Sequence, residues 1–205
     1  MLPGGWDRSG PKRGIGEGKP VSHDAGVRGD YNAHRKALAQ NLVDYNLGDS
    51  IVRLGWEFNG GWYRWRASDN SVSVGGLLAA NRDDDARRQR HEKAAVFWNP
   101  AMGWQQFPAD QAWPGDEYVD LVGLDVYDDS WAADTYPIPA RPSPQDIARR
   151  RDKTWNDVVY GGQFGLKFWR DFAQTHGKPF AIPEGASAIA KTGTADWTTR
   201  NSSSA

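Results

Sequence analysis

The stretch SIVRLGWEFNGGWYRW, residues 50–65, predicts a strand that runs into a polar and aromatic turn. Its first half, Ser50–Glu57, alternates in the way expected of a strand with two different faces. The apolar face carries Val52, Leu54 and Trp56, and the opposite face carries Arg53, Gly55 and Glu57. We therefore expect one face to pack beneath helices and the other to end in an ionisable residue at the strand's C-terminal tip.

Three further apolar segments are predicted as strands, at Ala94–Asn99, Val119–Tyr127 and Pro179–Glu184. Helices are predicted around them at Tyr31–Leu47 (after a possible Asp30 cap), Ser143–Val158 and Phe164–His176, whereas Ser71–Arg90 fits an amphipathic helix poorly. Alternating strands and helices indicate an α/β fold with a parallel sheet. In such folds the chemistry lies at the C-terminal strand ends, where Glu57, Asn99, Tyr127 and Glu184 all fall.

Length and charge limit the classes of protein that fit. The chain of 205 residues suits one domain, covering 1–205, and its net charge of −1 gives no electrostatic reason to expect a nucleic-acid partner. The basic run at Arg82–Lys93 is interrupted by aspartates and fits a solvated surface. No cysteine, membrane-length apolar run or signal peptide is visible, and the histidines lack paired metal-ligand spacing.

Eleven tryptophans are the unusual feature of the composition. Some must be core, because aromatic rings bury large areas. Several stand beside polar or glycine-rich sequence, where a flat apolar ring with polar neighbours suits sugar binding. These candidates are Trp62, Trp65, Trp104, Trp113 and Trp131.

Glu57 and Glu184 form a candidate pair for cleaving a glycosidic bond. One protonated carboxyl donates a proton to the leaving oxygen, while an ionised carboxylate attacks the anomeric carbon. A separation of ~5–5.5 Å between the two carboxyls is expected for this retaining, double-displacement route. The alternative for any two glutamates is that they are ordinary ion-pair partners or helix caps.

The sequence around these glutamates resembles glycoside hydrolase family 26, the β-mannanases of the retaining (β/α)8 barrels. RLGWEFNGGWYRW (53–65) resembles the family's acid/base motif, FWNP (97–100) its strand-five motif, PGDEYVDLVGLDVYD (114–128) its strand-six motif, and HGKPFAIPEGA (176–186) its strand-seven nucleophile motif. The resemblance extends over roughly residues 11–186. It implies strands four to seven of a TIM barrel, with Glu57 as acid/base and Glu184 as nucleophile.

The resemblance also implies supporting roles around the pair. Tyr127 would hydrogen-bond the nucleophile, and Trp62 would stack on the sugar. Arg53 and Asp125 would belong to the polar shell that sets the charge of both carboxylates, or would form a plain structural ion pair. Asn99 and Trp131 would line the substrate cleft, and Trp65 would stack on substrate or belong to the core.

Two departures from the family pattern stand out. Trp56 occupies the position before the acid/base glutamate, where the family usually has histidine, so the pH profile and substrate are open. A (β/α)8 barrel needs about 250 residues, but only 56 residues precede Glu57 and 21 follow Glu184. We therefore expect an incomplete barrel that is poorly soluble or inactive when expressed alone, and that folds when extended at both ends.

The expected activity is retaining endo-hydrolysis of a β-linked polysaccharide, most often β-1,4-mannan in the resembling family. Xylan or mixed-linkage β-glucan cleaved by the same mechanism is a second hypothesis, and a non-catalytic carbohydrate-binding remnant is a third. No metal or organic cofactor is expected, because two carboxylates suffice. The full-length parent is expected to be extracellular and monomeric, with a polysaccharide or oligosaccharide as its partner.

Overall fold

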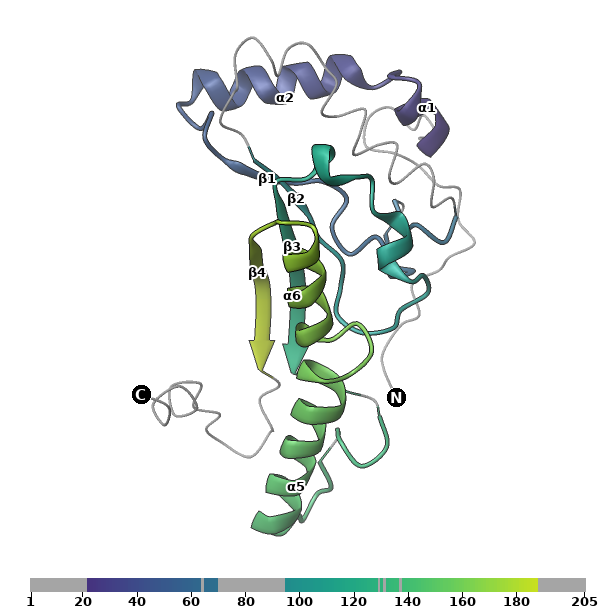
Figure 1. Cartoon of the computed structure of the whole chain (residues 1–205), viewed down its shortest axis with the longest axis vertical. Helices are drawn as coiled ribbons and strands as arrows, with labels where there is room; N and C mark the ends of the chain where they lie inside the picture. The colour runs from purple at the N-terminus through teal and green to yellow at the C-terminus, as the bar shows by residue number, and fades with distance from the viewer. Residues whose placement is uncertain are drawn as a thin grey trace.

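The computed structural model describes residues 22–63, 65–69, 95–128, 130, 132–136 and 138–187. Ser71–Arg90, Arg82–Lys93 and Trp131 lie outside the described residues. The elements in chain order (Figure 1) are α1 (His23–Val27), α2 (Asn32–Asp44), β1 (Ile51–Arg53), β2 (Ala95–Trp98), the 3-10 turns η1 (Ala109–Ala112) and η2 (Asp116–Tyr118), β3 (Leu121–Asp128), α5 (Pro144–Thr154), the π-helical turn η3 (Trp155–Tyr160), α6 (Leu166–Thr175) and β4 (Phe180–Ser187).

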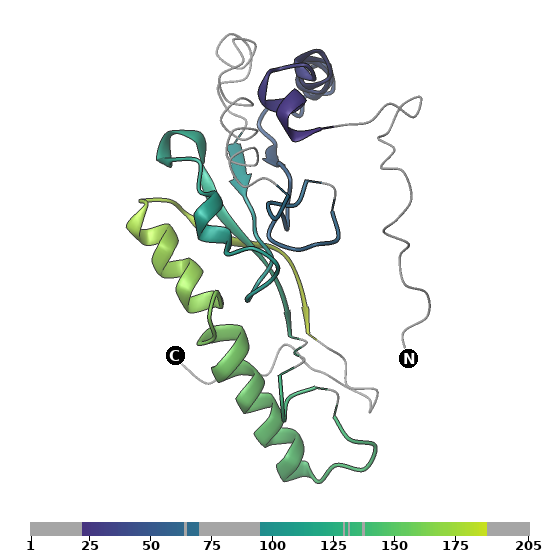
Figure 2. The same ribbon diagram turned by 90° about the vertical axis from the view of Figure 1, so that its right-hand side faces the viewer.

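The four strands form one parallel sheet in the order β1-β2-β3-β4. Spatial order therefore follows chain order without the reversal that defines a doubly wound sheet. α6 packs against β3 and β4 and lies along one side of the sheet (Figure 2). This arrangement is part of a (β/α) barrel, and it confirms the predicted parallel α/β architecture.

The first strand is shorter than predicted, because it ends at Arg53 and not at Glu57. Gly55 has a φ of 60° and Glu57 a φ of 52°, both in the left-handed region. A strand needs extended backbone with negative φ, so the chain turns at these residues. The prediction that Arg53, Gly55 and Glu57 lie on one face of the strand is therefore wrong for Gly55 and Glu57. Glu57 lies in a turn after the strand.

Two of the predicted helices lie close to where they were expected. α6 matches the prediction within two residues at its start. α5 begins at Pro144, and the Ser143 side chain caps it by accepting from the Asp146 N–H at 3.0 Å. The helix continues through Val158 as predicted, but from Trp155 to Tyr160 it has π-helical hydrogen bonding. α5 extends past the C-terminal ends of β3 and β4 (Figure 1).

α2 differs from its prediction in how it packs. Tyr31, and not Asp30, precedes the helix, and it makes no side-chain cap. Two of its large apolar side chains lie at the surface, since Leu38 is 52% exposed and Tyr45, which follows the helix, is 76% exposed. No residue of α2 is buried against the described part of the chain.

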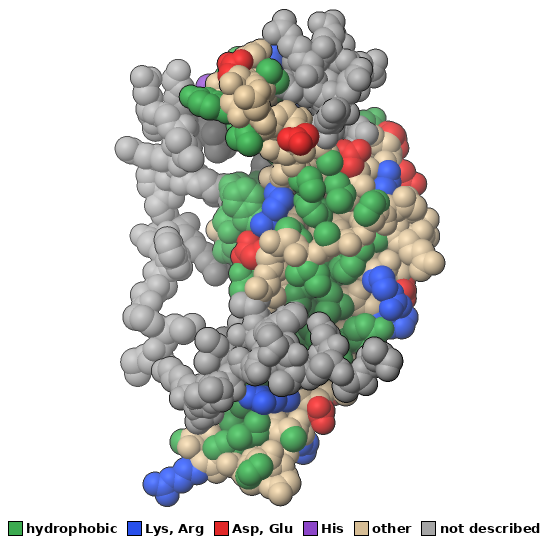
Figure 3. All heavy atoms as spheres, turned by 90° about the vertical axis from the view of Figure 1, so that its left-hand side faces the viewer, with side chains coloured by type: hydrophobic (Ala, Val, Ile, Leu, Met, Phe, Trp, Pro, Cys, Tyr) green, Lys and Arg blue, Asp and Glu red, His purple; other side chains and the backbone are tan. Residues whose placement is uncertain are grey.

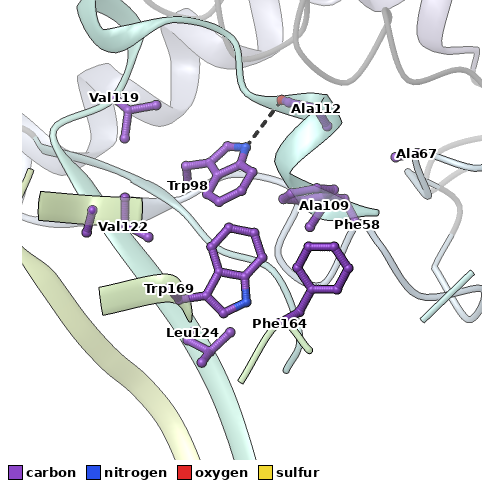
Figure 4. Close-up of a cluster of buried hydrophobic side chains, with 11 residues drawn as sticks. Phe58, Ala67, Trp98, Ala109, Ala112, Val119, Val122, Leu124, Phe164 and Trp169 are labelled. Carbon is purple, nitrogen blue, oxygen red and sulfur yellow. Dashed lines mark hydrogen bonds between the residues drawn. The ribbon is translucent and has the colours of Figure 1, made fainter. Parts of the chain in front are cut away.

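The hydrophobic core lies between the sheet and α6, and tryptophans dominate it (Figure 4). Trp98 of β2 and Trp169 of α6 are fully buried, with ring centroids 5.3 Å apart. The indole N–H of Trp98 donates to the Ala112 carbonyl at 3.4 Å, which ties η1 to the core. Trp113 packs edge-on against Trp98 at 5.1 Å. Trp113 therefore belongs to the core, and the sugar-binding prediction for it is wrong.

Apolar side chains also reach the surface. Hydrophobic side chains gather across the middle of one face of the molecule, with basic and acidic side chains among them (Figure 3). β4 is an edge strand of the described sheet, and Ile182 on it is 50% exposed. No helix in the described part of the chain is long and apolar enough to cross a membrane.

Candidate active site

The sheet brings together residues that lie far apart in the sequence. Arg53 stands at the C-terminal end of β1, Asp125 and Tyr127 lie in β3, and Glu184 lies in β4. Asp125 and Glu184 are direct neighbours in the register of these two strands, just after an irregularity at Gly123. Glu57 follows β1 in its left-handed turn. Parallel pairing thus gathers these side chains, because it places the C-terminal ends of all strands on one side.

Glu184 is held in its ionised form by two donors. The Tyr127 hydroxyl donates to Oε1, and Arg53 Nη1 donates to Oε2 at 3.2 Å. The tyrosine hydrogen bond is the largest influence and lowers the pKa of Glu184. Burial opposes it, and the hydrogen bond and charge of Arg53 lower the pKa further. The hydrogen bond to Glu184 also raises the pKa of Tyr127 to about 12, so the phenol keeps its proton and remains a donor. Glu184 is therefore an oriented carboxylate.

Replacing Tyr127 with phenylalanine tests this control of charge. The pKa of Glu184 is lowered chiefly by the tyrosine hydrogen bond, so its loss should raise that pKa toward the ordinary value. Any activity that depends on the Glu184 carboxylate should therefore fall at a higher pH in Tyr127→Phe than in the parent as the solution is acidified. The measurement is the acid limb of the pH–rate profile. Tyr118→Phe, on η2, is the matched control and should leave the limb in place.

Glu57 has the opposite electrostatic environment. Burial is the largest influence and raises its pKa, and the negative charges of Asp125 and Glu184 raise it further. The indole N–H of Trp62 donates to Glu57 Oε2 at 2.8 Å and partly offsets this rise. The turn that carries Glu57 is fixed by its own N–H, which donates to the Asn99 carbonyl at 2.7 Å. Glu57 is therefore the carboxyl of the pair that binds a proton more readily.

The two glutamates thus have pKa values displaced in opposite directions within one group of interacting charges. Such a pair supplies a proton donor and an ionised nucleophile at the same pH, which is how environment divides labour between two carboxyls. Among the described residues, no group of three or more His, Cys, Asp or Glu side chains is placed to hold a metal ion.

Asp125, which is buried, and Arg53, which is partly buried, support this group. Arg53 Nη2 lies 2.5 Å from Asp125 Oδ2, and the Asp125 side chain has no exposed surface. Burial raises the pKa of Asp125, while the Asn99 amide and Arg53 lower it. Asn99 is itself fully buried, beside Gly123, where a Cβ would come within 2.8 Å of its Oδ1. Asp125 and Asn99 therefore support the site from below, and neither offers an open surface to a ligand.

The tryptophans predicted to bind sugar have different positions. Trp62 is 53% exposed, and its ring folds back over Gly60, where a Cβ would lie 2.3 Å from it. Gly60, which has no side chain, thus leaves room for the ring to reach Glu57. Trp65 packs against the core and donates to the Trp56 carbonyl at 2.8 Å. Trp104 is 58% exposed, and its ring stacks on that of Phe164 with 5.9 Å between the centroids.

Two residues of the turn, Tyr63 and Asn59, were not predicted as site residues from the sequence. The Tyr63 hydroxyl accepts from the Trp56 indole at 3.1 Å, and Arg53 lies 5.9 Å from the Trp56 ring centroid. Trp56, which stands where the resembling family has histidine, thus packs beside Arg53 without adding a titratable group. Asn59 is 1% exposed and joins the turn to Ala101. The Asn-Gly that follows Glu57 was the available signal for it.

Comparison with known proteins supports the fold assignment. The chain matches no protein-family model and no curated protein sequence. Among solved structures, a GH26 β-mannanase from Bacteroides ovatus superposes with a TM-score of 0.53 at 16% identity, over 80% of this chain. The chain therefore has a fold like that of the GH26 β-mannanases.

Two further matches have lower TM-scores and do not add to this assignment. They are the Bacillus subtilis mannanase BCman (TM-score 0.45, 15% identity, 84% of this chain) and a β-mannanase from a symbiotic protist of the termite Reticulitermes speratus, complexed with gluco-manno-oligosaccharide (TM-score 0.44, 13% identity, 90% of this chain). The chain spans 44% of the length of the Bacteroides ovatus enzyme and 56% of each of the other two.

Proposed function

We propose that this chain carries the catalytic residues of a retaining β-glycoside hydrolase that acts on β-1,4-mannan. The observation that supports it most is the opposite displacement of the pKa values of Glu57 and Glu184 on a GH26-like fold. The complete catalytic unit is a (β/α)8 barrel, of which strands four to seven are β1 to β4.

In the first step, Glu184 attacks the anomeric carbon and the glycosidic C–O bond breaks. Glu57 gives its proton to the departing oxygen, so the leaving group departs as a neutral alcohol and a glycosyl ester forms on Glu184. In the second step, Glu57, now ionised, takes a proton from water, whose oxygen attacks the same carbon and releases Glu184. The expected separation of the two carboxyls is ~5–5.5 Å.

The surrounding residues set charge and position for these steps. Tyr127 and Arg53 keep Glu184 ionised and aimed, and Asp125 holds Arg53 in place. Trp62 is exposed and bonded to Glu57, so a sugar stacked on its ring would lie beside the acid/base. Trp56 does not titrate. The limb of the pH–rate profile that belongs to the acid/base should therefore follow the pKa of Glu57, with no contribution from a neighbouring histidine.

The test, made on the complete barrel, is trapping with a 2-deoxy-2-fluoro-β-mannosyl reagent that carries a good leaving group. The fluorine slows both steps, and the good leaving group restores the first, so the glycosyl ester accumulates. Mass spectrometry should show one added fluoromannosyl unit, and peptide mapping should place it on Glu184. Labelling of another residue, or none, would overturn the proposal. Hydrolysis of mannan, xylan and mixed-linkage β-glucan, compared on the same preparation, identifies the polymer, with mannan expected.

A further inference from the structure

Asn59 lies two residues after Glu57 and is buried. Its side-chain amide pairs with both backbone groups of one residue: Nδ2 donates to the Ala101 carbonyl at 2.8 Å, and Oδ1 accepts from the Ala101 N–H at 2.8 Å. The side chain thus forms the two-bond exchange that neighbouring antiparallel strands form through their backbones. An amide is planar, so two bonds to one partner fix both the distance and the orientation of the turn at residue 59.

The segment that Asn59 grips, residues 99–102, is bonded in turn to β3. Asp125 N–H donates to the Pro100 carbonyl at 3.1 Å, and Met102 N–H donates to the Asp125 carbonyl at 3.0 Å. Ala101 itself forms a parallel bridge with Asp125. The Asp125 carboxylate then holds Arg53, which reaches Glu184. A continuous series of hydrogen bonds therefore connects Asn59 to the carboxylate proposed as nucleophile.

Glu57 is fixed against the same segment from its other side. Its N–H donates to the Asn99 carbonyl at 2.7 Å, while its φ of 52° is one that non-glycine residues rarely adopt. Surrounding contacts must hold such a backbone in place. Asn59 also fixes the turn through its own carbonyl, which accepts from the N–H groups of Gln106 and Phe107 at 3.0 and 3.1 Å.

We infer that Asn59 is a positioning residue for proton transfer, which sets the Glu57 carboxyl relative to Glu184 through residues 99–102. This rests on the proposed function, in which Glu57 is the general acid. A misplacement of about 1 Å costs on the order of 10²-fold in rate. The cost should fall mainly on the step that needs the proton, because Asn59 lies in the turn that carries Glu57 and reaches Glu184 only through residues 99–102, Asp125 and Arg53.

A purely structural role would look different. Removing the amide leaves the N–H and carbonyl of Ala101 without their partner, which destabilises the fold whatever Glu57 does. Such a loss lowers the amount of active protein and affects every substrate equally. The dependence on leaving group therefore separates positioning from stability.

The experiment compares Asn59→Ala and the milder Asn59→Ser with the parent, Glu57→Ala and Thr154→Val. Thr154 is a buried control in α5, whose hydroxyl donates to the Arg150 carbonyl at 2.8 Å, away from both glutamates. Two rates are measured on protein whose cooperative melt is verified. They are the cleavage of a β-1,4-manno-oligosaccharide and the pre-steady-state burst of dinitrophenolate from a 2,4-dinitrophenyl β-mannoside, which needs no proton from Glu57.

Asn59→Ala should lower kcat on the oligosaccharide by about 10²-fold, with KM and the burst rate little changed, and Asn59→Ser should lower kcat less. Thr154→Val should lower the melting temperature without changing the ratio of the rates on the two substrates. The positioning role is overturned if both Asn59 variants show an equal reduction of the two rates, show no reduction of either rate, or fail to fold. If Glu57→Ala itself shows no dependence on leaving group, the proposed function is what has failed.

Discussion

Glu184→Ala should be the most damaging single substitution in this chain. Without the carboxylate there is no atom to attack the anomeric carbon, and no glycosyl ester can form. Loss of a catalytic nucleophile removes on the order of 10⁴-fold or more of the rate. We expect kcat on mannan to fall by at least that factor and labelling by the fluoromannosyl reagent to disappear. Intact-protein mass spectrometry measures the labelling directly.

Glu117→Ala is the matched control for this experiment. Glu117 is an exposed glutamate of η2, outside the group formed by Arg53, Glu57, Asp125 and Glu184. It should label and turn over like the parent. Labelling that persists in Glu184→Ala would show that the nucleophile is another residue, and equal loss in both variants would point to a general failure of the fold.

Glu57→Ala should have the second largest effect, and the effect should depend on the leaving group. General acid catalysis contributes typically 10²–10⁴-fold, and an alkoxide needs it, whereas dinitrophenolate leaves without a proton. Cleavage of manno-oligosaccharides should therefore fall by about 10²–10⁴-fold. The burst from 2,4-dinitrophenyl β-mannoside should remain, followed by slow steady-state turnover, because deglycosylation lacks its general base.

Azide provides the internal check on Glu57. It is a nucleophile that needs no deprotonation, so it should accelerate the slow second step of Glu57→Ala and release a β-glycosyl azide. It should not rescue Glu184→Ala on the same substrate with retention. A burst lost together with oligosaccharide cleavage, or no response to azide, would show that the roles of the two glutamates are misassigned.

The sequence was sufficient to predict features that depend on neighbouring residues. Strands β2, β3 and β4 lie within two or three residues of their predicted ends, because short apolar runs bounded by turn residues report burial directly. Ser143 and Pro144 marked the start of α5, since capping is a contact between residues three apart. The parallel order of the sheet followed from alternating strands and helices, and with it the expectation that Glu57 and Glu184 lie at the same end.

Features that depend on distant contacts were decided only by the tertiary structure. Glu57 leaves the strand and enters a left-handed turn, which is held by the Asn99 carbonyl and by the pairing of Asn59 with Ala101. Local alternation carries no information about such contacts. For the same reason the sequence could not separate the tryptophans: Trp113 packs in the core and Trp62 is exposed, although both stand in similar polar sequence.

The charge of the two glutamates is the clearest case. Both are glutamates at the ends of predicted strands, and their local sequences give no reason for different pKa values. Folding places Glu57 where burial and two negative neighbours raise its pKa. It places Glu184 against Tyr127 and against Arg53, which is 131 residues away in the chain, and these donors lower its pKa. The sequence thus determined which residues meet, whereas desolvation and hydrogen bonding, which exist only after folding, determined which of the two glutamates has the higher pKa.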